Sequence, residues 1–189
     1  MDDKPKKEKK RKAVFLDRDG IINKEVDNLR NINQIRLLPH VAKAIKKFKR
    51  NGYLVIVITN QPVVARGWIS ESELEEINQE LLRRLKNKGA IIDAVYYCPH
   101  HPKANLPKYR KDCSDRKPNI SLIIKAVQDF NISLKRSYFI GDSTTDLQTA
   151  FNAHIRSILV LTGYKGNDGR FNAKPDKVVA DLLQASNVV

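Results

Sequence analysis

The stretch that most constrains the fold is a short apolar run that ends abruptly in two carboxylates. Residues 13–16 read Ala-Val-Phe-Leu, and Asp17, Arg18, Asp19 and Gly20 follow them. A run without polar interruption predicts a strand buried on both faces, and the glycine predicts a tight turn just beyond it. In open parallel sheets, ligands bind in the crevice outside the carboxyl ends of the strands. We therefore expect Asp17 and Asp19 at a functional site, with a cation or a shared proton between them because two ionised carboxylates repel.

Further apolar runs predict more strands, with helical patterns between them. The predicted strands are Tyr53–Ile58, Ala90–Cys98, Tyr138–Ile140 and Ile158–Leu161, with Val178–Val179 as an edge strand. The predicted helices run from Pro39 to Gly52, from Ser70 to Gly89, over Ile120–Phe130, over Asp146–His154 and from Asp181. Ser70 and Glu73 form a capping box. This alternation predicts an α/β fold with a mainly parallel sheet.

Polar residues follow three of the predicted strands. Besides the first pair of carboxylates, Thr59 and Asn60 follow the second strand, and Asp142 and Asp146 follow the fourth. Because parallel strands bring their carboxyl ends to one edge, we expect these groups to converge there on Mg²⁺, with Lys117 as a positive counterweight. Asp146 also fits a plain helix cap, and an Asp-rich turn is the structural alternative for the first pair.

Length and charge limit the organisation of the chain. With 189 residues and 41% apolar content, the chain suits one folded domain, which we place at residues 13–189. Residues 1–12 are predicted to be a disordered basic tail, and the formal charge of +14 favours anionic ligands. Two cysteines do not suggest a disulfide framework, and no apolar run is long enough to span a membrane. We expect a cytoplasmic protein.

Four motifs in this order resemble those of the haloacid dehalogenase (HAD) superfamily of phosphotransferases. Asp17-Arg18-Asp19-Gly20 resembles its first motif, Thr59 its second, Lys117 its third and Gly141–Asp146 its fourth. The resemblance implies a three-layer, Rossmann-like HAD fold. It also implies a Mg²⁺-dependent phosphatase that works through an aspartyl-phosphate.

A closer resemblance is to the family of D-glycero-D-manno-heptose bisphosphate phosphatases and histidinol-phosphate phosphatases. It rests on residues 15–23, Thr59-Asn60-Gln61, Ala65-Arg66-Gly67, residues 97–102 and Arg116-Lys117-Pro118. Members of this family have no cap domain, and the present chain has no stretch long enough for one.

The resemblance implies a role for each matching residue. Asp17 would attack phosphorus, and Asp19 would protonate the leaving oxygen and then activate water. Thr59 would bind the phosphoryl oxygens, and Lys117 would neutralise charge in the transition state. Mg²⁺ would be held by Asp17, by the backbone carbonyl of Asp19 and by Asp142, with Asp146 in a supporting position. The substrate contacts that follow are Arg18, Gly20, Asn60, Gln61, Arg66 and Arg116, although Arg66 also reads as a plain surface charge.

The loop at residues 98–115 carries a second metal pattern. Cys98, His100, Cys113 and Asp115 resemble the zinc loop of this family, in which the last position is normally cysteine. His101 is a rival ligand, and the alternative is a loop without metal that keeps two buried thiols. A second departure is Ser143, where the close family often has lysine.

We expect a phosphatase of a small sugar phosphate, with heptose 1,7-bisphosphate first and histidinol phosphate as the alternative. The basic charge suggests a nucleic-acid end phosphatase as another candidate, but the aromatic residues show no base-stacking cluster. A non-catalytic binding module is the third candidate. We expect a monomer without a membrane partner.

Overall fold

The computed structural model describes residues 9–189, and its centre is a six-stranded sheet in which all neighbouring strands are parallel. The strand order is β3-β2-β1-β4-β5-β6. The strands are β1 (Lys12–Leu16), β2 (Tyr53–Asn60), β3 (Ala94–Cys98), β4 (Tyr138–Gly141), β5 (Arg156–Val160) and β6 (Lys177–Val179). The predicted α/β architecture with its parallel sheet is therefore confirmed, and Val178–Val179 lies in the edge strand as expected.

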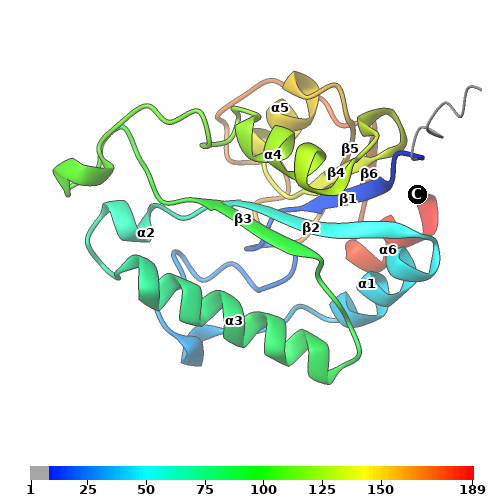
Figure 1. The fold of residues 1–189 in the computed structure, drawn as a ribbon, viewed down its shortest axis with the longest axis horizontal. Helices are drawn as coiled ribbons and strands as arrows, with labels where there is room; N and C mark the ends of the chain where they lie inside the picture. Colours follow the sequence, from blue (N-terminus) through cyan, green and yellow to red (C-terminus); the bar gives the residue numbers. More distant parts are fainter. Residues whose placement is uncertain (1–8) are drawn as a thin grey trace, which may run out of the picture.

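Helices cover both faces of this sheet and complete three layers. Figure 1 shows α3, α1 and α6 on one side of the sheet and α4 and α5 on the other. The helices are α1 (Val41–Arg50), α2 (Pro62–Ala65), α3 (Glu71–Asn87), α4 (Ser121–Phe130), α5 (Thr144–Asn152) and α6 (Leu182–Val188). One-turn helices lie at η1 (Ile32–Gln34), η2 (Pro107–Tyr109) and η3 (Leu134–Arg136). Among the described residues, no helix is both long and apolar enough to cross a membrane.

The central strand β1 shows why the sheet is buried on both faces. Val14 and Leu16 belong to the apolar core shared with α1, α3 and α6, whereas Ala13 and Phe15 belong to the core under α4 and α5. Successive side chains in a strand point to opposite faces, so an uninterrupted apolar run fills both cores. The prediction that this apolar run forms a strand buried on both faces is therefore confirmed.

Element boundaries differ from the predictions for local reasons. Helix α1 begins at Val41 rather than Pro39 because His40 has a left-handed backbone with φ of 61°. Strand β3 begins at Ala94 rather than Ala90 because the Asp93 side chain accepts a hydrogen bond from the Val55 backbone, which replaces a ladder bond. Helix α5 begins at Thr144, and β5 covers Arg156–Val160.

The predicted capping box of α3 is present. The Glu73 backbone N–H donates to Ser70 Oγ at 3.2 Å, and the Ser70 backbone N–H donates to the Glu73 carboxylate at 2.7 Å. Ser143 and Asp146 form a second capping box at α5. The short helix α2 was not predicted, because four residues show no helical period.

The predicted basic tail lies partly outside the described residues. Residues 1–8 carry as many acidic as basic side chains, so the net charge of the predicted tail comes from residues 9–12. These belong in part to the fold: Lys12 opens β1, and the Arg11 backbone N–H donates to the Asn131 carbonyl at 2.8 Å.

Strand order places a ligand crevice at β1 and β4. The chain builds the sheet from β1 outwards through β2 to β3, and then returns to the other side of β1 to add β4, β5 and β6. In doubly wound sheets, ligands bind where the strand order reverses, outside the carboxyl ends of the strands. Asp17 and Asp142, which follow β1 and β4 directly, flank this point.

Candidate active site

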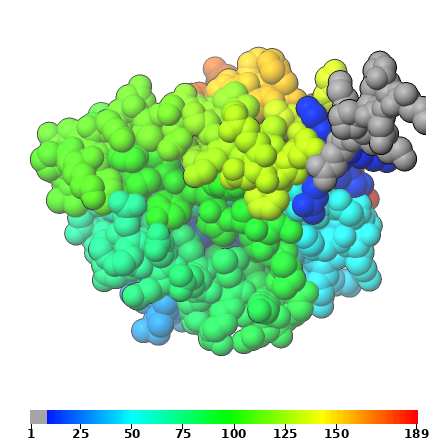
Figure 2. Space-filling view, viewed as in Figure 1, coloured from blue at the N-terminus to red at the C-terminus, as the bar shows by residue number. Residues whose placement is uncertain are grey.

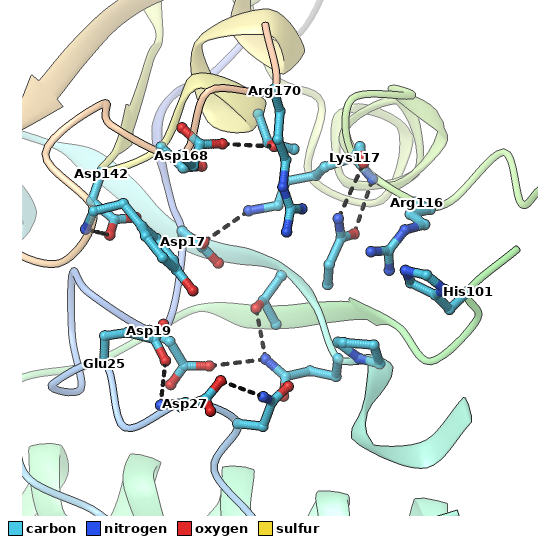
Figure 3. A pocket seen from close by; sticks show the side chains of 18 of the residues that line it. Asp17, Asp19, Glu25, Asp27, His101, Arg116, Lys117, Asp142, Asp168 and Arg170 are labelled. Carbon is cyan, nitrogen blue, oxygen red and sulfur yellow. Dashed lines mark hydrogen bonds and ion pairs between the residues drawn. The ribbon is translucent and has the colours of Figure 1, made fainter. Parts of the chain in front are cut away.

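A cavity of about 230 Å³ opens at the carboxyl ends of β1, β2 and β4. Its lining includes nine of the residues singled out in the sequence: Asp17, Asp19, Thr59, Asn60, Gln61, Arg66, Arg116, Lys117 and Asp142. Figure 3 shows carboxylates and cationic side chains that point into this space from separate loops. The structure therefore brings together residues that are up to 125 positions apart in the sequence.

Asp17 and Lys117 form the buried centre of the cavity. The Lys117 ammonium is 3.1 Å from Asp17 Oδ2 and donates to Asp146 Oδ1 at 2.6 Å. The backbone N–H of Arg18 donates to the other Asp17 oxygen at 2.7 Å. Burial lowers the pKa of Lys117, but Asp146 and Asp17 outweigh burial and raise it, so this lysine stays charged.

The side chain of Asn60 holds the backbone of Lys117 in place. Its side-chain carbonyl accepts from the Lys117 backbone N–H at 2.9 Å, and its amide donates to the Lys117 carbonyl at 3.1 Å. Because both ends of the amide are occupied by backbone, Asn60 acts as a positioning residue, although it also lines the cavity as predicted. Thr59 is 1% exposed and accepts from Gln61 Nε2 at 2.9 Å.

Asp142 occupies the tightest position in the site. Its Oδ2 accepts from the Tyr164 backbone N–H at 2.6 Å. A Cβ at either Gly20 or Gly163 would collide with its carboxylate. Gly20 also has φ of +77°, a conformation that other residues rarely adopt. The glycine of the first motif is thus required because the Asp142 side chain packs against it.

The carboxylates are poised for a cation. Burial, with Asp146 and Asp17 nearby, raises the pKa of Asp142 to about 8. Burial also raises the pKa of Asp17 to about 6, although Lys117 acts in the opposite direction. Oxygens of Asp17, Asp142 and Asp146 lie within 4.8 Å of one another. A hard divalent cation would relieve this repulsion, so the donor set fits Mg²⁺.

Asp146 is the least available of these three carboxylates. Its Oδ1 accepts from Lys117, and its Oδ2 accepts from Ser143 Oγ at 2.7 Å and from the Ser143 backbone N–H at 3.2 Å. Both oxygens are therefore occupied by the protein, which fits the supporting position that the sequence suggested. Its role as a helix cap and its contact with the lysine coexist.

Arg18 has a different place from the predicted one. Its side chain is fully buried and does not line the cavity, so a side-chain contact with substrate does not fit the structure. Its guanidinium donates to Asp19 Oδ2 at 2.7 Å, to Gln61 Oε1 at 2.7 Å and to Asn78 Oδ1 at 2.9 Å. Arg18 therefore orients Asp19 from the protein interior. This role was not predictable from the sequence, because Asn78 lies among the apolar residues of the buried face of α3.

Gln61 completes the support of Asp19. Its amide nitrogen donates to Asp19 Oδ2 at 3.1 Å, while Asp19 Oδ1 has only a contact of 3.3 Å with the guanidinium of Arg18. One carboxylate oxygen is thus held firmly and the other is more open to the cavity. Such an arrangement suits a group that exchanges a proton with bound substrate.

The long loop after β3 brings three of the four predicted zinc ligands together. Ligand atoms of Cys98, His100 and Cys113 lie within 4.8 Å of one another, and Asp115 is not part of this cluster. His101, the rival ligand, lines the cavity instead, and its Nδ1 accepts from the Lys103 backbone N–H at 3.0 Å. Burial raises the pKa of the Cys98 thiol to about 12, so a bound cation would be needed to form its thiolate.

This loop extends past the edge of the sheet and packs on α2. The Leu106 backbone N–H donates to the Ala65 carbonyl at 3.1 Å, and Figures 1 and 2 show the loop over α2. Its end delivers Arg116, whose guanidinium donates to the His100 carbonyl at 3.0 Å. The geometry of the loop therefore determines where Arg116 and Lys117 enter the cavity.

Several cavity residues were not predicted. They are Glu25, Asp27 and Asn28 from the loop after β1, His101 as a cavity residue, and Thr145, Tyr164, Asp168 and Arg170 around the start of α5 and the loop after β5. The last loop, rich in glycine and polar residues, has no periodic pattern that points to a site. Glu25 and Asp27 lie across the cavity from Arg116 and His101, so charge is divided between its sides (Figure 3).

Trp68, the single tryptophan of the sequence, packs against two arginine side chains. The guanidinium carbons of Arg30 and Arg66 lie 3.9 Å and 4.7 Å from the centre of the Trp68 ring. Arg66 also donates to Asn28 Oδ1 at 3.0 Å. Arg66 is therefore held by an aromatic face and a hydrogen bond at the cavity wall, which argues against the alternative of a plain surface charge.

Comparisons with known proteins agree with the geometry. The family model described as HAD-hydrolase-like matches residues 114–185. A D-glycero-beta-D-manno-heptose-1,7-bisphosphate 7-phosphatase from Haemophilus ducreyi is 35% identical over 92% of this chain and 95% of its own. A D-glycero-alpha-D-manno-heptose-1,7-bisphosphate 7-phosphatase from Photorhabdus laumondii is 37% identical over 86% of this chain and 89% of its own.

Solved structures give the same result. The D,D-heptose 1,7-bisphosphate phosphatase from B. bronchiseptica, complexed with magnesium and phosphate, superposes with a TM-score of 0.81 at 28% identity. The alignment covers 94% of this chain and 97% of the other. A putative HAD-like phosphatase from Mesorhizobium loti also has a TM-score of 0.81, at 30% identity over 95% of this chain and 87% of its own.

Proposed function

Because the chain belongs to the heptose bisphosphate phosphatase family of HAD-like hydrolases, we propose that it removes the 7-phosphate from D-glycero-D-manno-heptose 1,7-bisphosphate. The chain is a phosphatase, and the aspartyl-phosphate route is general for its superfamily. The observation that carries the substrate assignment is a cavity that holds the proposed nucleophile Asp17 next to Lys117 together with a group of cationic side chains.

In the proposed reaction, an Asp17 oxygen attacks phosphorus while the bond from phosphorus to the sugar oxygen breaks. Asp19 gives its proton to that oxygen, and the sugar leaves with a hydroxyl group. Asp19 then takes a proton from water, which attacks phosphorus, and phosphate leaves as the Asp17 carboxylate is restored. The Lys117 ammonium and the Thr59 hydroxyl stabilise the charge on the phosphoryl oxygens.

We propose Asp17, Asp142 and the backbone carbonyl of Asp19 as the holders of Mg²⁺. When bound, Mg²⁺ would neutralise part of the charge on the carboxylates and on the phosphoryl group. For the loop at residues 98–115 we propose zinc held by Cys98, His100 and Cys113, whose donor types suit that ion. A cytoplasmic location and a monomeric state remain predictions.

The charge of the cavity favours a bisphosphate over histidinol phosphate. Arg116 and His101 lie on one side of the cavity (Figure 3), Arg66 and Arg170 also line it, and the three guanidinium groups suit a second phosphate. Histidinol phosphate carries an ammonium group, which these residues would repel. Glu25 and Asp27, on the other side, offer acceptors for sugar hydroxyl groups.

The experiment is a phosphate-release assay with Mg²⁺ on a defined panel. The panel contains both anomers of heptose 1,7-bisphosphate, heptose 7-phosphate, histidinol phosphate and a 5′-phosphorylated oligonucleotide. We expect the highest kcat/KM for one heptose 1,7-bisphosphate anomer, and no measurable turnover with Asp17→Asn, which loses the nucleophile. A higher kcat/KM for histidinol phosphate or for the oligonucleotide would refute the substrate assignment, and an active Asp17→Asn would refute the mechanism.

A further inference from the structure

The loop between β5 and β6 contributes a cationic side chain to the cavity. Arg170 lies in this loop, lines the cavity, and in Figure 3 points into it from the side of α5. Within residues 9–189 no ion pair involves its guanidinium. By contrast, Arg66 and Arg116 each have a hydrogen-bond acceptor from the protein.

Residues on both sides of Arg170 are anchored to the first turn of α5, one by its side chain and one by its backbone. Asp168 Oδ1 accepts from the Thr144 backbone N–H at 2.6 Å, and the Phe171 backbone N–H donates to Thr144 Oγ1 at 3.1 Å. These bonds fix the residues two before and one after Arg170. The loop is therefore already ordered without a ligand, and binding does not require a further loss of conformational entropy from it.

The same loop is also tied to the catalytic carboxylate. The Tyr164 backbone N–H donates to Asp142 Oδ2 at 2.6 Å, and the Gly166 backbone N–H donates to the Asp142 carbonyl at 2.7 Å. Thr162 Oγ1 donates to the Gly20 carbonyl at 2.6 Å. The loop is therefore a wall of the active site rather than a free surface connection.

The position of Arg170 associates it with the other cations rather than with the nucleophile. Lys117 already pairs with Asp17, whereas Arg170, Arg116 and Arg66 face the cavity without carboxylate partners in the described chain. Burial, and after it the charges of Arg170 and Arg66, lower the pKa of Arg116. Cations held this close together are stabilised by an anion.

We infer that Arg170 is a specificity-determining residue that binds the phosphate of the substrate that is not hydrolysed. This inference rests on the proposed function and deepens it. Arg170 acts through substrate affinity: its guanidinium donates to the second phosphate, while the transferred phosphoryl group stays with Lys117 and Thr59.

The test compares a bisphosphate with a monophosphate in two matched variants. Arg170→Gln removes the cation at the cavity, and Lys174→Gln removes one from an exposed position of the same connection, outside the cavity lining. We expect Arg170→Gln to raise KM for heptose 1,7-bisphosphate by roughly ten- to one-hundredfold, as for the loss of a charged hydrogen bond. The KM for heptose 7-phosphate and both kcat values should change less than about twofold, and Arg170→Lys should recover part of the loss.

Equal effects on the two substrates, no effect on either, or the same selective effect in Lys174→Gln would overturn the inference. Because Arg170 is exposed, the variant should fold, and an unchanged Tm would verify this.

A second measurement separates this inference from the substrate assignment. Fructose 1,6-bisphosphate and fructose 6-phosphate are used as competitive inhibitors of whichever substrate of the panel is hydrolysed. If heptose 1,7-bisphosphate is not a substrate but Arg170→Gln selectively weakens the bisphosphate inhibitor, the substrate assignment fails, whereas the binding of a second phosphate by Arg170 is supported. If heptose 1,7-bisphosphate is hydrolysed but Arg170→Gln weakens both inhibitors equally, the inference fails and the assignment holds.

Discussion

At the scale of single residues, the position of Asp142 depends on neighbouring glycines that have no Cβ atom. Its carboxylate packs against Gly20 and Gly163, where any Cβ would collide with it. Asp142 is thereby held near Asp17, and burial of both charges raises the pKa of each. Two glycines without side chains thus determine the position of a carboxylate that we propose as a Mg²⁺ ligand.

Gly20→Ala should therefore impair catalysis and stability together. Gly52 provides a matched control because its φ is also +77°, but a Cβ there would meet only Lys12 Cε at 3.8 Å. Both alanine variants should lose about 1–2 kcal/mol from the strained backbone. Only Gly20→Ala should also lose Mg²⁺ affinity and most of kcat. Urea unfolding and Mg²⁺-dependent kinetics measure the two effects, and equal kcat losses in both variants would contradict the packing argument.

Arg18→Gln should reduce kcat rather than affinity. Its guanidinium makes three buried contacts, with Asp19, Gln61 and Asn78, and none with the cavity. Removing the charge leaves their acceptors unpaired, which should cost about 3 kcal/mol of stability and misorient Asp19. Steady-state kinetics should show a lower kcat with KM within about twofold. A raised KM at unchanged kcat would contradict this expectation and would support the substrate contact of Arg18 that was predicted from the sequence.

The residues that the sequence identified and those it missed differ in how they are specified. Asp17 and Asp142 directly follow the buried strands β1 and β4, and Thr59 lies at the carboxyl end of β2, so the sheet alone brings them together. Arg170 reaches the cavity because its neighbours Asp168 and Phe171 form hydrogen bonds with Thr144, which lies 24 and 27 residues before them. Such tertiary contacts leave no periodic pattern in the chain. The same holds for Arg18, because its burial depends on Asn78 from another element.

At the scale of elements, strands and long helices were predictable and their ends were not. Apolar period and the Ser70 capping box located β2 and α3. The start of β3 depends on the side chain of Asp93, which also pairs with Lys49 at 2.6 Å. The loop after β3 was predicted to be functional from its length and its cysteines. Its course over α2 depends on contacts such as that of Leu106 with Ala65, which the sequence does not reveal.

This loop leads to a prediction about zinc. Cys98→Ser or Cys113→Ser should lower stability and reduce turnover, because the loop positions Arg116 and Lys117 although neither thiol lines the cavity. Added Mg²⁺ should not rescue these variants. Asp115→Cys should bind zinc more tightly if residue 115 reaches the ion. Elemental analysis of protein purified without chelator should give about one zinc per chain. A metal-free protein with full activity, whose Tm does not respond to zinc, would refute the site.

For the molecule as a whole, the buried carboxylates link stability to pH and to metal. In the metal-free fold the pKa of Asp17 is about 6 and that of Asp142 about 8, above the usual 3.8 of the unfolded chain. Between pH 3.8 and these raised pKa values, the folded state holds protons that the unfolded state has lost. The stability that the protonated carboxyl groups contribute is therefore fully present below about pH 4, and it is lost as the pH rises through about 6 and about 8.

Mg²⁺ should reverse this trend because it binds the ionised pair. We expect a Tm increase with Mg²⁺ that is larger at pH 8 than at pH 5, in protein dialysed free of Mg²⁺ without chelator so that zinc is kept. Asp142→Asn should abolish most of the increase at both pH values. Differential scanning calorimetry measures it, and an equal increase at pH 5 and pH 8 in the unmodified protein would contradict the linkage.

Trp68 gives the chain a built-in optical reporter of its own active site. It is the only tryptophan, and it packs under the guanidinium of Arg66, a cavity residue. An anion that draws Arg66 away from the indole would change the emission without any added label. In Asp17→Asn, which does not turn over, titration with heptose 1,7-bisphosphate should give a saturable change in intensity, and Arg66→Gln should reduce it. Binding detected by calorimetry without any change in emission would show that Arg66 stays on the ring. If the emission does change, stopped-flow fluorescence of the unmodified enzyme would separate substrate arrival from product release in time, and the signal of Trp68 would report which of them limits turnover.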